Sequence, residues 1–184
     1  ITSAIEHHAV LNCMKELENQ GFEVTYLQPD SLGNISLESL KAALRKDTIL
    51  VSIMMVNNEV GSVMPIDKMA KLTHKLCPDA IFHTDAVQGF LKIPFAAKTL
   101  GADLISVSSH KIHGPKGVGA LYIKNGTKLK KILRHSGKAV RNQRRILFCS
   151  LLRFCRCTAV GDGILKATRF ANDGHAAVTE SHHL

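Results

Sequence analysis

The sequence predicts an α/β fold with a mainly parallel central sheet flanked by helices, and three observations support this. Apolar runs typical of strands alternate with amphipathic segments typical of helices over the first 123 residues. One of these runs, residues 48–56, is almost entirely apolar, as in strands buried on both faces. Clusters of polar residues follow three of the runs, where ligands bind in open α/β sheets.

Six short runs are expected to form strands, and three amphipathic segments are expected to form helices. The strands are predicted at 1–3, 22–27, 48–56, 80–83, 104–107 and 119–123, and the helices at 8–19, 36–44 and 67–77. Gly21 lies just past the first helix as a C-cap, and Pro65 precedes the third. Ser36 is a good N-cap for the second helix, with Glu38 in its first turn.

Composition indicates an ordinary globular protein rather than a membrane or secreted one. The 184 residues are 45% hydrophobic and 21% charged, and no apolar run approaches the ~20 residues of a membrane-spanning helix. The chain has neither a signal segment nor an initiator Met, so we expect a fragment. Five cysteines without framework spacing indicate reduced thiols and a cytoplasmic protein.

The net charge of +9 comes from one segment of the chain. Eleven of the 24 Lys and Arg residues lie between Lys124 and Cys157, which contains no Asp or Glu. The 13 remaining cations face 15 anions, so the rest of the chain is mildly acidic. A basic stretch could bind nucleic acid. Because the segment has only two aromatics and no recognised motif, this function is not favoured.

A group of Cys and His residues near the end of the chain is a weak candidate for a metal site. The group consists of Cys155, Cys157, His175, His182 and His183. Its spacing fits no common zinc pattern, so no metal is predicted.

The segment 107–119 carries the strongest chemical signal. Lys111 stands where a strand opens into a glycine-rich turn, and we expect it to be partly desolvated there. Desolvation lowers the pKa of an ammonium group and yields the neutral amine that imine chemistry needs. The neighbouring hydroxyls, imidazole and glycine amides suit an anionic ligand such as phosphate.

Polar residues after two other predicted strands complete a possible site for an aldehyde cofactor with a ring nitrogen. Such a cofactor needs a carboxylate at its ring nitrogen, amides at its phenolic oxygen and a flat side chain over the ring. Asp85 can be the carboxylate, and Asn58 and Gln88 the amides. His7 or His8, before the first helix, could cover the ring. Each residue alone is more often part of a turn or a cap.

Four linked motifs resemble those of the cysteine desulfurases, class-V aminotransferase-fold enzymes that use pyridoxal 5′-phosphate. The motifs are TSAIEHHAVL at 2–11, VNNEVG at 56–61, HTDAVQ at 83–88 and SSHKIHGPKG at 108–117. The resemblance implies that residues 1–133 form the central part of the large domain of the type I pyridoxal-phosphate fold. Residues 134–184 are expected to be a divergent basic and His-rich tail.

The resemblance implies a role for each matching residue. Lys111 would bond covalently to the cofactor, and His7 would stack on its ring and assist proton transfer. Asp85 would pair with the ring nitrogen. The other cofactor-binding residues would be Asn58 and Gln88 at the phenolic oxygen, with Ser108 and His110 at the phosphate. We interpret His8 and His113 as ordinary polar positions, and Lys116 as a residue that supports its turn rather than one that binds substrate.

The tail departs from the family after about residue 133. The family's Gly-Thr pair, its mobile loop with a nucleophilic cysteine and its substrate-binding arginine have no counterpart here. Cys149, Cys155 and Cys157 lie in arginine-rich, apolar contexts that do not favour a persulfide carrier. We hypothesise that the sequence after about residue 145 is a variant terminus or is read in an altered frame. Translating the other two frames of the encoding DNA would test this.

The resemblance implies an enzyme that converts L-cysteine to L-alanine and transfers sulfur as a persulfide. It also implies a homodimer and a sulfur-acceptor protein. This chain is expected to be incomplete and not to complete that cycle by itself. The alternatives are a selenocysteine lyase, another class-V enzyme acting on an amino acid, or a non-catalytic remnant of one.

Overall fold

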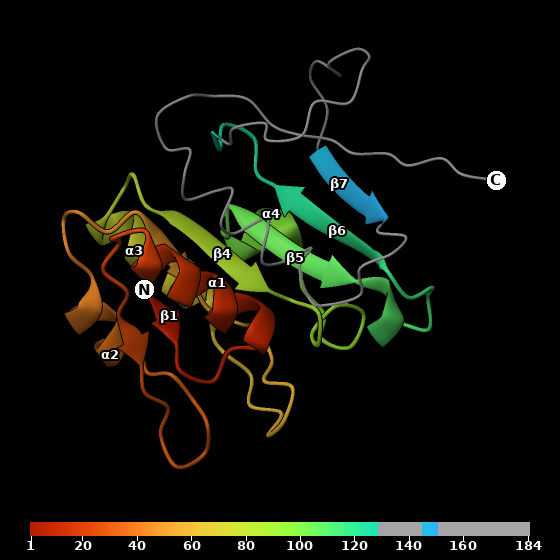
Figure 1. The fold of residues 1–184 in the computed structure, drawn as a ribbon, viewed down its shortest axis with the longest axis horizontal. Coiled ribbons are helices and arrows are strands. Elements are labelled where there is room, and N and C mark those ends of the chain that lie inside the picture. Colours follow the sequence, from red (N-terminus) through yellow and green to blue (C-terminus); the bar gives the residue numbers. More distant parts are fainter. Residues whose placement is uncertain (129–144, 151–184) are drawn as a thin grey trace.

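Helices lie on both faces of a seven-stranded sheet in the computed structural model, which describes residues 1–128 and 145–150 (Figure 1). The strand order is β2-β1-β3-β4-β5-β6-β7. The strands are β1 (Thr2–Ser3), β2 (Tyr26–Leu27), β3 (Leu50–Ser52), β4 (Ile81–Asp85), β5 (Leu104–Ser108), β6 (Val118–Ile123) and β7 (Arg145–Ser150). The first five are mutually parallel, and β6 and β7 are each antiparallel to their neighbour. The predicted fold class is therefore confirmed.

The three predicted helices are confirmed with small changes in their bounds. The helices are α1 (His8–Asn19), α2 (Leu37–Ala43), α3 (Ile66–Leu76) and the short α4 (Ala97–Leu100). Ser36 caps α2, since its Oγ accepts a hydrogen bond from the backbone N–H of Ser39 at 2.9 Å. Gly21 adopts a left-handed conformation with φ of 88° just after α1, as a C-cap glycine does. In the part of the chain described, no helix is long and apolar enough to cross a membrane.

Two predicted strands are shorter than expected, and their partner explains why. The run 22–27 forms only Tyr26–Leu27, and the run 48–56 forms only Leu50–Ser52. Both strands pair with β1, which has two residues. After β3 ends, the chain still bonds to β4, since the N–H groups of Ile53 and Met55 donate to the carbonyls of His83 and Asp85. The apolar run 48–56 therefore determines that this segment is buried, while the short strand β1 determines how long the paired part of β3 is.

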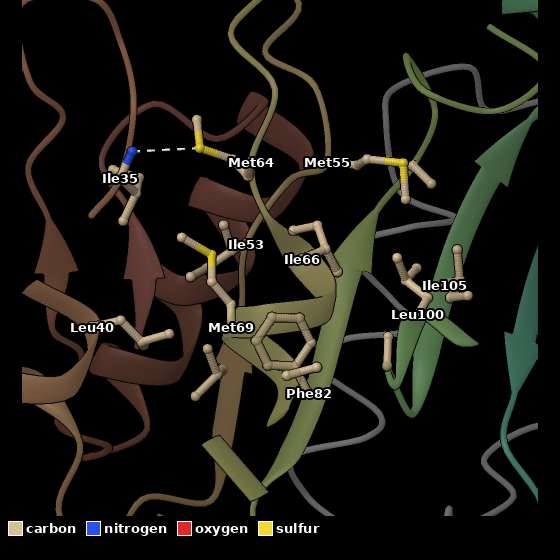
Figure 2. Close-up of a cluster of buried hydrophobic side chains, with 14 of the residues drawn as sticks. Ile35, Leu40, Ile53, Met55, Met64, Ile66, Met69, Phe82, Leu100 and Ile105 are labelled. Atoms are coloured by element: carbon tan, nitrogen blue, oxygen red, sulfur yellow. Dashed lines mark hydrogen bonds between the residues drawn. The ribbon is translucent and has the colours of Figure 1, made fainter. Parts of the chain in front are cut away.

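The main hydrophobic core lies between the sheet and helices α2, α3 and α4. Figure 2 shows Phe82 of β4 beside Met69 of α3, and both are fully buried. Met64 Sδ accepts a hydrogen bond from the backbone N–H of Ile35 at 3.4 Å within the same cluster. A second cluster covers the other face, where Val10 and Met14 of α1 pack against Leu50. Both faces of β3 are thus covered, as predicted for this strand.

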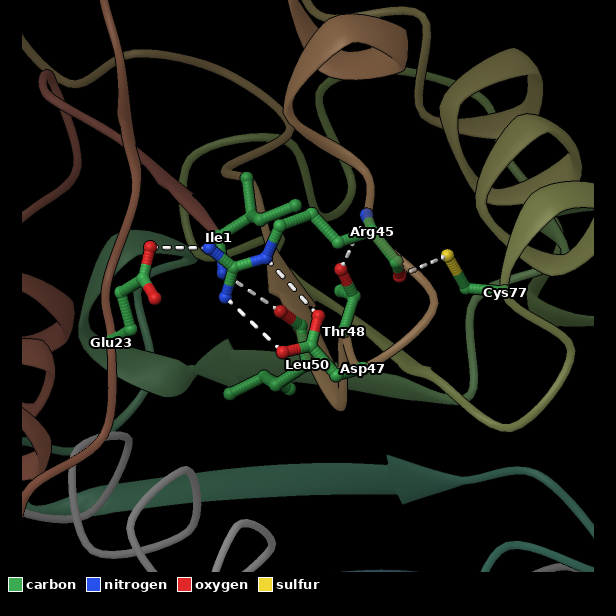
Figure 3. A network of polar contacts seen from close by, with 7 residues as sticks. All are labelled: Ile1, Glu23, Arg45, Asp47, Thr48, Leu50 and Cys77. Carbon is green, nitrogen blue, oxygen red and sulfur yellow. Dashed lines mark hydrogen bonds and ion pairs between the residues drawn. The ribbon is translucent and has the colours of Figure 1, made fainter.

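Polar contacts fasten the amino-terminal edge of the sheet around Arg45. Its guanidinium contacts Glu23 and Asp47, and its backbone N–H donates to Thr48 Oγ1 at 2.9 Å (Figure 3). The thiol of Cys77, at the end of α3, donates to the carbonyl of Arg45 at 3.0 Å. The edge opposite the candidate site is therefore held together by loop contacts.

Candidate functional site

The predicted site residues lie at one edge of the sheet, where the parallel strands β1, β3, β4 and β5 end. His7 follows β1, Asn58 follows β3, and Asp85 ends β4. Ser108 ends β5, and Lys111 ends the single 3-10 turn that follows it, η1 (Ser109–Lys111). Strands β4 and β5 are neighbours in which Asp85 pairs with Ser106. The acid and the amine therefore belong to the same edge rather than to opposite sides of the sheet.

Asp85 is a buried carboxyl group at the end of a central strand. Its side chain is 6% exposed, and its Oδ1 accepts a hydrogen bond from the backbone N–H of Val87 at 2.9 Å. Burial raises the pKa of Asp85, while the bond from Val87 and the nearby charge of His7 act in the opposite direction. A cation placed against this carboxyl group would be bound more strongly than at the protein surface.

His7 is held by the helix that it begins. Its Nδ1 accepts a hydrogen bond from the backbone N–H of Ala9 at 3.1 Å, so His7 is the N-cap of α1. A nitrogen that accepts cannot carry the proton, which leaves Nε2 as the N–H donor of the neutral ring. The imidazole is half-buried, and it lies near enough to Asp85 for their charges to interact. His8, by contrast, is exposed.

The turn that carries Lys111 is shaped by Ser109 and Gly114. The Ser109 hydroxyl donates to the carbonyls of Pro115 and Val118, and the Ser109 carbonyl accepts from the N–H of Gly114 at 2.9 Å. A Cβ atom at Gly114 would lie 2.8 Å from the Cβ of Ser109, so only glycine fits there. The glycine-rich text after Lys111 therefore closes a tight loop against the end of β5.

Lys111 itself is exposed among the described residues, which corrects the expectation of partial desolvation. The reason is local: η1 lies past the sheet edge, and no described segment covers it. Ser108 Oγ and His110 Nδ1 are hydrogen bonded at 2.5 Å, which groups two of the predicted phosphate ligands beside the lysine. Desolvation of the amine would require a bound ligand or a further protein segment.

The two amide residues assigned to the phenolic oxygen are available for binding. Asn58 is exposed at the strand-end edge. Gln88 is half-buried, and its Oε1 accepts a hydrogen bond from Lys92 Nζ at 2.9 Å. This contact leaves the amide nitrogen of Gln88 as the end that can donate to a ligand.

Two buried residues shape this edge but were not predicted from the sequence. Asn57 Oδ1 accepts from the backbone N–H groups of Glu59 and Val60, both at 2.9 Å, and its Nδ2 donates to the carbonyl of Ile5 at 2.9 Å. Glu6 is 5% exposed, and its Oε1 accepts from the N–H of Met54 at 2.7 Å. An Asn-Asn pair and a Glu before a helix carry no local sign of such long-range bonds.

The hollows that the structure describes lie at the opposite edge. A cavity of about 810 Å³ is lined by His74, Asp103 and Lys124, and one of about 420 Å³ by Phe22, Arg45 and Ile49. His74 and Lys124 both contact the buried Asp103, at 2.7 and 3.1 Å, so these charges are already paired. Neither of these two cavities includes a residue of the strand-end site.

The described part of the chain holds no group of three or more potential metal-binding side chains. Of the cysteines in that part, Cys13 and Cys77 are buried in the helical layers, away from the strand-end site. Cys149 belongs to β7, of which only the backbone is described, and Cys155 and Cys157 lie outside the described residues. The candidate metal group of the tail also lies outside them.

The chain belongs to the class-V aminotransferase family, which matches residues 1–146. The relatives it resembles are cysteine desulfurases, as the sequence motifs predicted. It is 51% identical over 144 residues to the cysteine desulfurase IscS of Dictyoglomus turgidum, and 49% identical over 144 residues to that of Methanosarcina thermophila. Each match covers 78% of this chain, but 36% and 35% of the relatives, so the chain spans about a third of their length.

Solved structures agree with this assignment. A NifS-like protein superposes with a TM-score of 0.72 at 39% identity, covering 91% of this chain and 43% of the other. SspA in complex with cysteine gives a TM-score of 0.70 at 36% identity, covering 92% and 46%. The family is one of pyridoxal-phosphate-dependent enzymes, which confirms the predicted class of protein.

The residues at the strand-end edge fit pyridoxal phosphate by their chemistry. They combine an amine at Lys111, a buried acid at Asp85 and an imidazole at His7 whose tautomer is fixed. Ser108 and His110 add hydroxyl and imidazole groups beside the amine. Each functional group of the cofactor therefore has a partner of suitable chemistry on this chain.

Proposed function

We propose that this chain is the cofactor-binding part of a pyridoxal-phosphate-dependent cysteine desulfurase. The complete enzyme converts L-cysteine to L-alanine and passes the sulfur on as a persulfide. One observation carries most weight: Asp85 and the turn holding Lys111 follow adjacent parallel strands, with His7 near Asp85. The names of the relatives, and the cysteine bound to SspA, support the substrate class.

The proposed residue roles follow from the chemistry of each side chain. Lys111 Nζ is the amine that bonds to the cofactor aldehyde, and Asp85 holds a proton at the ring nitrogen. His7 covers the ring and has its Nε2–H free to face the substrate. Pyridoxal phosphate, when bound, supplies an electron sink for negative charge developing on the substrate.

Four further side chains complete the proposed binding set. Asn58 and the amide nitrogen of Gln88 donate to the phenolic oxygen, and Ser108 and His110 bind the phosphate. Asn58, His110 and Lys111 are exposed, so the site needs cover from protein beyond the described residues. Exclusion of water by that cover would desolvate Lys111 and prepare it for bond formation.

We propose that a second copy of the chain supplies part of this cover in a homodimer. Apolar side chains are exposed on loops at the strand-end edge, including Leu32 at 75%, Val60 at 67%, Val63 at 52% and Leu91 at 75%. Two of these loops are joined, since Ser62 Oγ donates to the carbonyl of Gly33 at 2.7 Å. Exposed apolar loops beside a polar site are typical of protein interfaces. Sedimentation at several concentrations tests the dimer, with Val60→Asp and Leu91→Asp as interface variants.

The persulfide-forming cysteine is proposed to be neither Cys13 nor Cys77, because both are buried. The sulfur acceptor is proposed to belong to iron–sulfur cluster assembly, consistent with the relatives named IscS. A cytoplasmic location is proposed because the chain has an odd number of cysteines without the spacing of a disulfide framework.

Product analysis tests the proposed reaction directly. The chain is loaded with pyridoxal phosphate and given L-cysteine or L-selenocysteine, and alanine is measured together with sulfide or selenide. Alanine formed from cysteine supports a desulfurase, whereas turnover of selenocysteine alone indicates a selenocysteine lyase. Cofactor binding without alanine from either substrate would show that this chain binds the cofactor but does not turn over by itself. Failure to bind the cofactor would contradict the proposal.

A further inference from the structure

Glu6 occupies a place where a backbone carbonyl would normally continue the sheet. Strand β1 pairs with β3 in parallel, and Ser52 donates its N–H to the carbonyl of Ile1 at 2.9 Å. Two residues further along, the N–H of Met54 is the next donor that points towards β1. It donates to the Glu6 carboxyl group at 2.7 Å instead of to a backbone carbonyl. The side chain of Glu6 therefore extends the ladder after β1 has ended.

The same carboxyl group joins the ends of two strands, and a backbone bond extends this connection to a third. Glu6 Oε1 also accepts a hydrogen bond from Ser3 Oγ, at the end of β1, at 2.6 Å. On the far side of Met54, the N–H of Met55 donates to the carbonyl of Asp85 at 2.8 Å. A continuous set of bonds thus runs from β1 through Glu6 and the end of β3 to Asp85. His7 directly follows Glu6, so this set of bonds fixes where its imidazole lies.

Only one oxygen of the Glu6 carboxyl group is hydrogen bonded among the described residues, which disfavours a buried negative charge there. Both donors reach Oε1, while Oε2 is buried and has no hydrogen-bond partner among the described residues. A buried ionised carboxylate needs donors at both oxygens. Glu6 also lies near the carboxyl group of Asp85, and two adjacent carboxyl groups resist ionising together.

We propose that Glu6 is a positioning residue of the cofactor site. Its carboxyl group stays protonated, and it clamps the loop between β1 and α1, which contains His7, to the end of β3. Asp85 is then left as the single negative charge available to a ring nitrogen. Burial raises the pKa of Glu6 to about 8; the bonds from Ser3 and Met54 oppose this rise, and the charge of Asp85 adds to it. The titratable groups beside Glu6 are Asp85 at the end of β4 and His7, its neighbour in the chain.

This role rests on the proposed function, so its test separates the two. The full chain is titrated with pyridoxal phosphate, and the absorbance of covalently bound cofactor near ~420 nm is followed below and above pH 8. Wild type is compared with Glu6→Ala, which removes the clamp, and with Glu6→Gln, a neutral side chain of the same shape. Carbon-13 NMR of the glutamate carboxyl groups, with the Glu6 signal assigned by its loss in Glu6→Gln, reports protonation without any cofactor.

We expect the Glu6 signal to titrate near pH 8, well above an ordinary glutamate. Below that pH, Glu6→Ala should weaken cofactor binding about tenfold or more, and Glu6→Gln should rescue it to within about threefold of wild type. Above it, wild type should weaken relative to Glu6→Gln, because ionising a buried carboxyl group beside Asp85 disfavours the clamped conformation in wild type alone.

Three results would overturn the inference. The first is a Glu6 carboxyl group that ionises in the ordinary glutamate range, which decides the matter even where Glu6→Ala fails to fold. The second is a Glu6→Gln variant that binds as poorly as Glu6→Ala. The third is a folded Glu6→Ala that binds like wild type. Absence of the band in wild type would instead defeat the proposed function, and the positioning role with it.

Discussion

Among the described residues, Asp85 accepts a hydrogen bond through one of its carboxyl oxygens, Oδ1, from the backbone N–H of Val87 at 2.9 Å. This oxygen shapes the turn after β4, because Asp side chains commonly accept a hydrogen bond from the backbone N–H two residues further along the chain. The other oxygen is left to bind a ligand. The same side chain therefore has a structural and a chemical task, and substitutions can separate them.

Asp85→Asn should keep the turn and lose the charge. We expect cofactor binding to weaken about tenfold or more, since a hydrogen bond to a charged group contributes roughly 1.5–3 kcal/mol. Folding stability should not fall, because burial disfavours the ionised form of Asp85. Asp85→Ala should lose both tasks and unfold at lower urea concentration. Absorbance titrations and urea midpoints check this, and equal stability of the two variants would contradict the bond to Val87.

The adjacent residues Asn57 and Asn58 should behave differently when changed to Ala. Asn57→Ala should lower the free energy of unfolding by about 1–3 kcal/mol, because buried donors and acceptors lose their partner. Asn58→Ala should leave stability unchanged and weaken cofactor binding, since its side chain is exposed at the site. Urea denaturation and cofactor titration of both variants test the assignment. A stability loss in Asn58→Ala equal to that in Asn57→Ala would contradict it.

His83 should make the protein sensitive to acid. Its ring is fully buried, and its nitrogens lie 2.8 Å from Ser52 Oγ and Ser106 Oγ, so it joins β3, β4 and β5. Burial lowers the pKa of His83 from 6.5 to about 3. The unfolded chain therefore binds more protons than the folded one between these values. Stability should be fully present above pH 6.5 and should fall as the pH drops towards 3, by on the order of 4 kcal/mol.

Urea midpoints measured against pH test this role with a matched pair of variants. His83→Gln should be less stable at neutral pH by about 1–3 kcal/mol but should lose less on acidification, because no buried imidazole has to be protonated. His8→Gln alters an exposed ring and should follow the wild-type profile. An acid profile of His83→Gln parallel to that of wild type would show that His83 is not responsible.

The helices could be predicted closely from the sequence because their signals are local. Ser36 and Gly21 are cap residues at the expected positions, and apolar spacing defines the buried face of α1. The strand lengths could not be predicted in the same way. The ladder of β3 depends on β1, which is 48 residues earlier in the chain and very short.

The position of the candidate site residues was predictable where they lie at strand ends, as Asp85 and Lys111 do. The supporting residues were not, because their bonds join distant segments. Glu6 bonds to Met54, and Asn57 bonds back to Ile5. The exposure of Lys111 was not predicted either, since the glycine-rich sequence indicates a tight turn but not which segment covers it. Contacts between strand ends, rather than local patterns, decide both features.

The covalent role of Lys111 is tested most directly by adding pyridoxal phosphate to wild type, Lys111→Ala and Lys116→Ala and recording absorbance near ~420 nm. Lys116 is a matched control, an exposed lysine on the same loop. Wild type and Lys116→Ala should both develop the band, and borohydride reduction should fix the cofactor to residue 111 in each. Lys111→Ala should show neither the band nor covalent label. A band of equal strength in Lys111→Ala would contradict the assignment of this lysine as the cofactor-binding residue.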